Sequence, residues 1–232
     1  MNVIITGATK GIGKACSLYF ASKGFDVIFC ARTEHDIFSL KSEIEQMYSV
    51  KVHAIACDLS LKSDVKKFGE FCLAVSSEFD VLINNAGIFL SGGLLEEEDG
   101  NLETLIEINI YSAYYLTRMI APEMIKNKQG HIFNLCSVAS LQAYESGGSY
   151  TITKFGLLGF SKSLRNELKH HFVKVTAVLP GAVLTQSWEG TELPEERFID
   201  VNEVAKLIWN AYDTSQRTVV EEILIRPMLG DI

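Results

Sequence analysis

Short apolar runs alternate with longer amphipathic stretches along the whole chain. The apolar runs, most of them rich in Val, Ile and Phe, lie at 2–6, 26–30, 51–56, 80–85, 131–136, 174–179 and 221–226. Continuous apolar character over so few residues is typical of strands that are buried on both faces, as in parallel sheets. The stretches between them, such as 36–49 and 101–127, are long enough for helices, and Pro122 is expected to kink or divide the second one.

Strands that alternate with helices predict right-handed βαβ units. We therefore expect an α/β fold: a doubly wound parallel sheet of seven strands with helices on both faces, which is a Rossmann fold. No internal repeat, low-complexity tract or linker interrupts the pattern. The expected organisation is a single domain over residues 1–232.

Composition and charge exclude several classes of partner. With 47% hydrophobic residues the chain can bury a large core, and a net charge of -8 argues against nucleic acid or an anionic membrane as the main partner. The acidic run "EEED" at 96–99 is typical of a solvated face. The apolar runs are too short to span a membrane, and the first residues lack the features of a signal peptide. A cytoplasmic location is expected.

The cysteine and histidine pattern predicts no metal site. The histidines His131, His170 and His171 are expected at the surface or at a strand edge, without ligand spacing. The cysteines form no CxxC motif and no cluster with histidine, which is typical of reduced, buried thiols; they are Cys16, Cys30, Cys57, Cys72 and Cys136.

A glycine-rich turn, "TGATKGIG" at 6–13, follows the first predicted strand and opens a helix. Glycines at 7, 11 and 13 permit a tight turn and let backbone N–H groups approach a pyrophosphate, next to the positive end of a helix dipole. Such a turn can also be a plain strand-to-helix connection. Its place after the first strand of a βαβ unit favours a nucleotide site.

The spacing of these glycines resembles the cofactor turn of the short-chain dehydrogenase/reductase family, and further motifs follow in that family's order. "NNAG" at 84–87 follows the fourth strand, and "PGAVLT" at 180–185 follows the sixth. Between them lie the positions that match the family's catalytic set: Asn109, Ser137, Tyr150 and Lys154. The resemblance spans nearly the whole chain, and the joint order and spacing of the motifs carry it.

Tyr150 is the candidate general acid/base of a carbonyl reduction. A carbonyl oxygen needs a proton or strong hydrogen bonds to accept a hydride on its carbon. Lys154 lies one helical turn after Tyr150, on the same face, and its ammonium is expected to lower the pKa of the phenol. Tyr144 has Gly148 at the matching position. The alternative is a tyrosine packed on the sheet beside a solvated lysine.

The resemblance implies the roles of the other catalytic residues. Lys154 would also bind the nicotinamide ribose, and Ser137 would hold the carbonyl oxygen of the substrate. Asn109 would help to hold a water that relays protons through Lys154. The alternatives are a loop hydroxyl for Ser137, one of four serines between residues 136 and 149, and an amide bonded to neighbouring backbone for Asn109.

The resemblance also implies a set of cofactor contacts. Asp58 would bind the adenine amine, although it could be a turn residue, and Asn85 to Gly87 would pass close to the adenosine ribose. Val183 and Thr185 would contact the carboxamide. The full expected set is Gly7, Thr9, Lys10, Gly11, Ile12, Gly13, Arg32, Asp58, Leu59, Asn85, Ala86, Gly87, Tyr150, Lys154, Pro180, Gly181, Val183 and Thr185.

The end of the second strand favours NADP over NAD. NAD enzymes of this architecture place an acidic residue there to bind the ribose 2′-hydroxyl. Here Ala31 occupies that position and Arg32 follows, while Asp26 lies at the wrong end of the strand. Lys10 lies in the glycine-rich turn. Two cations without a carboxylate suit a 2′-phosphate, although both could be ordinary surface charges.

The substrate is expected to be a small carbonyl or alcohol. The segment 185–201 is short for a lid, and its order is left open. Candidate pocket walls, each of which could equally be ordinary packing, are Phe89, Leu141, Tyr144 and Trp188. One alternative is a 3-oxoacyl thioester reductase. The C-terminal sequence "VVEEILIRPMLGDI" departs from the usual ending of such reductases in the family, which makes this alternative less favoured.

An alternative of another class is a non-catalytic NADP-sensing protein, which the presence of all four catalytic groups disfavours. The family resemblance implies a homodimer or homotetramer packed through long helices. The apolar run "FGLLGF" at 155–160 is compatible with such packing, or with burial on the sheet.

Overall fold

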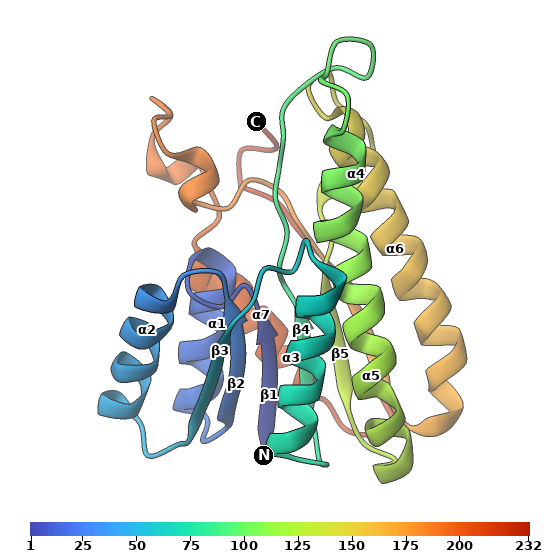
Figure 1. Cartoon of the computed structure of the whole chain (residues 1–232). Helices are drawn as coiled ribbons and strands as arrows, with labels where there is room; N and C mark the ends of the chain where they lie inside the picture. Colours follow the sequence, from blue (N-terminus) through green and yellow to red (C-terminus); the bar gives the residue numbers. More distant parts are fainter.

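A seven-stranded, all-parallel sheet forms the centre of the computed structural model, which describes residues 1–232 (Figure 1). The strand order is β3-β2-β1-β4-β5-β6-β7. This confirms the expected fold class. The strands are β1 (Asn2–Thr6), β2 (Asp26–Ala31), β3 (Val52–Ala56), β4 (Val81–Asn84), β5 (His131–Leu135), β6 (Lys174–Pro180) and β7 (Glu222–Ile225).

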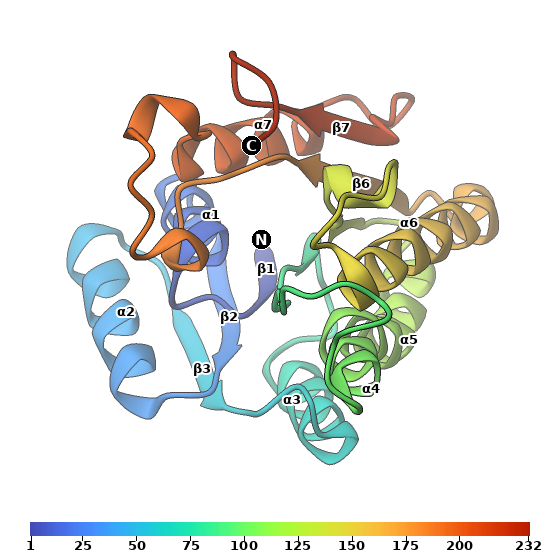
Figure 2. The same ribbon diagram turned by 90° about the horizontal axis from the view of Figure 1, so that it is seen from above.

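Helices cover both faces of the sheet, as Figure 2 shows from above. The helices are α1 (Gly11–Ser22), α2 (Glu34–Met47), α3 (Lys62–Val75), α4 (Asn101–Ile106), α5 (Ser112–Asn127), α6 (Gly148–Leu168) and α7 (Val201–Tyr212). α1, α2 and α7 share one core cluster of 26 buried residues, and α3, α5 and α6 share a second of 19 on the opposite face. None of the helices is long and apolar enough to cross a membrane.

Pro122 does not divide the helix, because α5 continues through this residue. Pro122 is exposed, so the carbonyl that loses its helical hydrogen bond can be hydrated by solvent. The interruption lies earlier, where a π-helical turn over Glu107–Tyr111 joins α4 to α5. Such turns are frequent at functional sites, and this one contains Asn109.

The carboxyl ends of the strands define where a ligand can bind. β1 pairs with β2 on one side and with β4 on the other, so the strand order reverses at β1. In open α/β sheets a crevice forms outside the strand ends at such a switch point. The glycine-rich turn follows β1 and the "NNAG" motif includes the last residue of β4, which places both motifs at this edge.

His131 is buried, which corrects the expectation of a surface or strand-edge residue. It opens β5, a central strand, and is 1% exposed. The hydroxyl of Thr176 donates to the carbonyl of Val220 at 2.5 Å, so Nε2 of His131 must donate to that hydroxyl, at 2.7 Å. Burial, with help from the charge of Lys174, holds the pKa of His131 well below its usual value.

The expectations for the other two histidines and for the burial of the cysteines are confirmed. His170 and His171 are exposed. All five cysteines are buried and unpaired, and no group of side chains is arranged to hold a metal ion.

The buried neutral His131 makes stability dependent on pH. The pKa of His131 is lowered in the folded protein, so below pH about 6.5 the unfolded chain binds a proton that the folded protein does not bind. Proton binding by the unfolded chain alone lowers the free energy of unfolding as the pH falls. Between pH 7 and pH 5 the free energy of unfolding should therefore fall by up to about 2 kcal/mol more in the parent than in His131→Gln. Urea unfolding of both proteins at the two pH values measures this. Equal losses in the two proteins would contradict it.

Candidate active site

The glycine-rich turn after β1 leaves no room for a side chain. Gly7 has a φ of +62°, and a Cβ on Gly13 would lie 2.3 Å from the carbonyl oxygen of Gly7 and 2.5 Å from Nδ2 of Asn85. That amide nitrogen donates to the carbonyl oxygens of Thr6 at 2.9 Å and Gly7 at 3.0 Å. The amide of Asn85 therefore holds the turn in place, and Gly13 lets the backbone pack closely.

The start of α1 is open to an anion. Lys10 is the N-cap residue, but its side chain caps no backbone N–H. The N–H groups of the first turn are therefore available to phosphate oxygens, beside the positive end of the helix dipole. Thr185, from the segment after β6, lies against the same turn, because a Cβ on Gly11 would lie 3.0 Å from its Cγ2. These features fit a dinucleotide pyrophosphate.

Ser137 is held rigidly two residues beyond the end of β5. Its Oγ accepts the N–H of Ala139 at 3.1 Å, and its own N–H donates to Oγ of Ser140 at 3.2 Å. This reciprocal pair opens a 3-10 turn over Val138–Ser140. Because Oγ uses only a lone pair here, the hydroxyl hydrogen stays free to donate to another group.

Lys154 is buried, at 6% exposed, between α6 and the end of β5. Its Nζ donates to the carbonyl oxygen of Leu135 at 2.8 Å and lies 5.5 Å from the ring centre of Tyr150. A Cβ on Gly87 would lie 3.6 Å from this nitrogen, so the "NNAG" segment approaches the same point. Burial lowers the pKa of Lys154 to about 8. Two of its three hydrogens are free for ligand oxygens.

The pKa of Tyr150 is raised to about 12, which corrects the expectation that Lys154 lowers it. Burial of the phenol is the main cause, and a hydrogen bond with Ser137 acts in the opposite direction. The ammonium of Lys154 instead points to the carbonyl of Leu135. In this protein Tyr150 is therefore a phenol at neutral pH, and Ser137 is the group that favours its ionised form.

Asn109 uses its whole side-chain amide on the protein. Its Oδ1 accepts the N–H of Ile88 at 2.8 Å, and its Nδ2 donates to the carbonyl of Ile88 at 3.0 Å and to Oγ1 of Thr153 at 3.1 Å. This arrangement matches the alternative of an amide bonded to neighbouring backbone. It fixes the segment after β4 to the π-helical turn and to α6. The role of Asn109 in holding a water stays a prediction.

The remaining expected cofactor contacts are placed in different ways. Oδ1 of Asp58 accepts from the N–H of Ser60 at 3.0 Å and from its hydroxyl at 2.8 Å, so this carboxylate closes its own turn. Ala86 lies against the glycine-rich turn, 3.2 Å from where a Cβ of Gly7 would be. The side chain of Val183 is buried in the core, so a ligand contact there would come from its backbone.

The charges near the end of β2 are unequal. Arg32 is exposed and forms no ion pair, whereas Nζ of Lys10 lies 3.7 Å from Oδ2 of Asp36, in the first turn of α2. The sequence indicated two free cations and no carboxylate at this place. The structure places the carboxylate of Asp36 beside Lys10, so the charge of Lys10 is partly neutralised, whereas Arg32 has no carboxylate partner.

Three of the four candidate pocket residues lie close to α6, the helix that carries Tyr150 and Lys154. The ring of Phe89 packs edge-on against Tyr150 with centres 5.0 Å apart. Tyr144 lies beside Gly147, just before α6, and Leu141 follows the 3-10 turn of Ser137; both are about two-fifths exposed. Trp188 differs, because its ring packs against Phe198 of its own segment at 5.0 Å.

Backbone hydrogen bonds close the base of the segment 185–201. Leu184 donates to the carbonyl of Ile199 at 3.0 Å, and Ile199 donates to that of Ala182 at 2.9 Å. Between these bonds lie two 3-10 turns, Gln186–Trp188 and Glu195–Arg197. In Figure 1 this segment, drawn in orange, rises above α1 and α2.

Three residues with structural roles at the site were missed by the sequence reasoning. Thr6 accepts the N–H groups of Asn85 and Ala86, each at 2.9 Å, and Thr153 supports Asn109. Glu97 contacts Ser149 at the start of α6. Thr6 begins the glycine-rich motif and could have been singled out, but Glu97 lies in an acidic run that gave no such signal.

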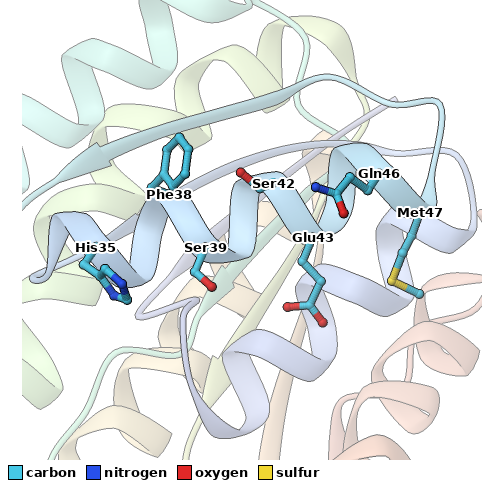
Figure 3. Close-up of a pocket in the computed structure, with 7 residues that line it drawn as sticks. All are labelled: His35, Phe38, Ser39, Ser42, Glu43, Gln46 and Met47. Atoms are coloured by element: carbon cyan, nitrogen blue, oxygen red, sulfur yellow. The ribbon is translucent and has the colours of Figure 1, made fainter.

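A hollow of about 540 Å³ along α2 is separate from these residues (Figure 3). All the residues that line it, from His35 to Met47, come from α2 itself. Its walls include none of the catalytic candidates. The candidate catalytic side chains therefore lie outside this hollow.

Comparisons with known proteins agree with this geometry. The family model described as short chain dehydrogenase matches residues 1–196. A sepiapterin reductase of Chlorobaculum tepidum is 31% identical over 238 residues, covering 99% of this chain and 97% of that protein.

Two solved structures have the same fold. A metagenomic short-chain oxidoreductase in complex with NADP is 31% identical, with a TM-score of 0.86 over 98% of this chain and 97% of that one. A short-chain dehydrogenase from Sphingobium yanoikuyae in complex with NADPH is 29% identical, with a TM-score of 0.85 over 95% and 87%. With its strand order, glycine-rich turn and Ser-Tyr-Lys arrangement, this chain belongs to the short-chain dehydrogenase family of oxidoreductases.

Proposed function

We propose that this protein is an NADP(H)-dependent reductase of small carbonyl compounds, or the corresponding alcohol dehydrogenase, with Tyr150 as general acid/base. The observation that carries the proposal is the meeting of three groups at the end of β5: the free hydroxyl hydrogen of Ser137, the buried phenol of Tyr150 and the buried ammonium of Lys154. A purely structural site would have no need to bury a cation beside a phenol.

Ser137 and Tyr150 have different roles in the proposed carbonyl reduction. When it is bound, NADPH supplies the hydride that the carbonyl carbon accepts. Ser137 donates a hydrogen bond to the carbonyl oxygen, and Tyr150 donates its proton to the same oxygen as negative charge develops there. A phenol with a pKa near 12 is protonated at neutral pH, which suits this acid role. In alcohol oxidation the proton moves the other way.

Lys154 serves both the cofactor and the tyrosine in this proposal. One hydrogen of its ammonium is held by the carbonyl of Leu135, and the other two are available to ribose hydroxyls. Its positive charge stabilises the phenolate that remains after Tyr150 has given up its proton. Asn109 and Gly87 shape the backbone beside this ammonium, so that the ribose can approach it closely.

The adenosine end of the crevice suits NADP. Ala31 offers no carboxylate to bind a ribose 2′-hydroxyl, and Arg32 is an exposed, unpaired cation at the end of β2. The complexes of the two similar structures with NADP and NADPH support the same cofactor. The first turn of α1 would hold the pyrophosphate.

The oligomeric state stays a prediction. Exposed Tyr114 on α5 and exposed Ile152 and Phe155 on α6 offer an apolar surface to a second copy of the chain. The "FGLLGF" run is divided between the two expected roles, because Phe155 faces outward while Leu157 and Leu158 are buried. A homodimer or homotetramer packed through these helices is our proposal.

Replacing Tyr150 tests the reaction itself. Tyr150→Phe should bind NADPH like the parent but lose turnover by at least about 100-fold, the usual contribution of a general acid. The matched control Tyr144→Phe, which lacks a lysine partner, should keep most activity. The measurement is NADPH oxidation with a panel of aldehydes, ketones, 1,2-diketones and 3-oxoacyl thioesters. A parent that binds NADPH but reduces none of them would favour the sensing protein, and equal activity of the two variants would refute the role of Tyr150.

The pKa of Lys154 predicts the alkaline limit of reduction. Because burial lowers this pKa from 10.5 to about 8, the ammonium is present below pH 8 and is lost as the pH rises. The value of kcat/KM for carbonyl reduction should therefore fall by up to about tenfold per pH unit above 8. Lys154→Met should lose turnover at every pH and also bind NADPH more weakly. A flat profile from pH 7 to pH 9.5 would contradict this assignment.

Arg32→Ala should separate the two cofactors. A hydrogen bond to a charged group contributes roughly 1.5–3 kcal/mol, so NADPH affinity should fall by about tenfold or more. NADH affinity should barely change, because NADH lacks the 2′-phosphate. Lys10→Ala is the matched comparison, and its effect should be smaller since Asp36 already neutralises part of its charge. Fluorescence titration with both cofactors measures these affinities. Similar losses of NADPH and NADH affinity in Arg32→Ala would exclude a role of Arg32 in binding the 2′-phosphate.

A further inference from the structure

The segment between β4 and α4 is fastened to the start of the catalytic helix. The N–H of Gly92 donates to the carbonyl of Ser146 at 3.2 Å. A Cβ on Gly148, which has a φ of +31°, would lie 2.3 Å from the carbonyl oxygen of Gly92. The two backbones thus touch at a point where only glycine fits. Figure 1 shows this segment beside the N-terminus of α6.

The carboxylate of Glu97 binds the first turn of α6. Its Oε2 accepts the backbone N–H of Ser149 at 3.3 Å, and its Oε1 accepts the hydroxyl of the same residue. The N-cap residue of α6 is Gly147, which has no side chain to satisfy these orphan N–H groups. A carboxylate at a helix N-terminus is also favoured by the helix dipole. Glu97 therefore caps α6 from 52 residues away along the chain.

The acidic neighbours of Glu97 make no such contact. Glu96, Glu98 and Asp99 are exposed, and their side chains form no hydrogen bond or ion pair. Only one member of the "EEED" run is therefore part of the site. Its partner Ser149 is 1% exposed and Glu97 itself is half-buried, so the contact is partly buried.

The fastened segment touches the reacting phenol. Tyr150 directly follows Ser149, and the ring of Phe89 packs edge-on against it at 5.0 Å. Asn109 holds Ile88, just before Phe89, through both backbone groups. The segment is thus fixed at Ile88 and at Glu97, and between these two points it forms a wall against Tyr150.

We propose that Glu97 is a positioning residue for the reaction: it anchors the first turn of α6 and thereby sets the place of the Tyr150 hydroxyl relative to Ser137. This inference rests on the proposed function. General acid catalysis requires hydrogen-bond distance between donor and substrate oxygen, and a misplacement of about 1 Å can cost 100-fold in rate. Glu97 acts through Ser149 and does not touch the substrate itself.

The test compares Glu97→Ala and Glu97→Gln with Glu98→Ala, an exposed neighbour in the same run. In Glu97→Ala kcat should fall by about tenfold or more while the Kd for NADPH changes less than about twofold, because the cofactor contacts lie at the glycine-rich turn and at Lys154. Glu97→Gln should recover most of kcat, since its amide oxygen can still accept from Ser149. Glu98→Ala should match the parent. The probes are NADPH and the panel compound that the parent reduces fastest.

Two results would overturn the proposal. One is a Glu97→Ala variant with parental kcat. The other is a parallel loss of kcat, NADPH affinity and unfolding free energy, which would mean general damage to the fold.

Amide hydrogen exchange at Ser149, measured without ligand, distinguishes this proposal from the proposed function. Faster exchange in Glu97→Ala, but not in Glu98→Ala, would support the anchoring of α6 even in a protein that reduced no panel compound, in which event only the proposed function fails. Unchanged exchange in Glu97→Ala would refute the anchoring.

Discussion

The buried ammonium of Lys154 is the constraint on which the arrangement of the site depends. Removing a cation from water is costly unless the protein gives it hydrogen-bond partners, and here the carbonyl at the end of β5 is its one protein partner. This contact joins α6 to the strand end that carries Ser137. Burial nevertheless disfavours the charged form and lowers the pKa of Lys154 to about 8. The position of Tyr150, one turn earlier on α6, follows from this attachment.

Side-chain amides build the walls around this centre by binding backbone. Asn85 holds the glycine-rich turn after β1, and Asn109 holds Ile88 in the segment after β4. A side-chain amide can both donate and accept a hydrogen bond. Asn109 therefore pairs with the N–H and the C=O of Ile88, as a neighbouring strand would in a sheet. Irregular loops at the strand ends are thereby fixed without regular secondary structure. A precise site needs such fixation, because catalytic geometry tolerates little displacement.

Charge is distributed differently at the two ends of the crevice. Beside the end of β2 the cations are exposed, and Lys10 already has a carboxylate partner in Asp36. At the end of β5 the cation of Lys154 is buried, and a backbone carbonyl is its only hydrogen-bond partner. Exposed charges are screened by salt and select among ligands, whereas buried charges shift pKa values strongly. The first arrangement suits recognition of a cofactor, and the second suits proton transfer.

The pattern of apolar runs was enough to predict a parallel sheet of seven strands, and the order and spacing of the motifs were enough to indicate the family, because these are local properties of the chain. It also selected Tyr150 over Tyr144, since a residue one turn later on a helix is fixed by numbering alone. The three-dimensional structure was needed to show that burial raises the pKa of Tyr150, that His131 lies in the core, and that Asp36 and Glu97 contact residues distant in the sequence. These outcomes depend on desolvation and on contacts between distant segments, and neither is written in the spacing of residues along the chain.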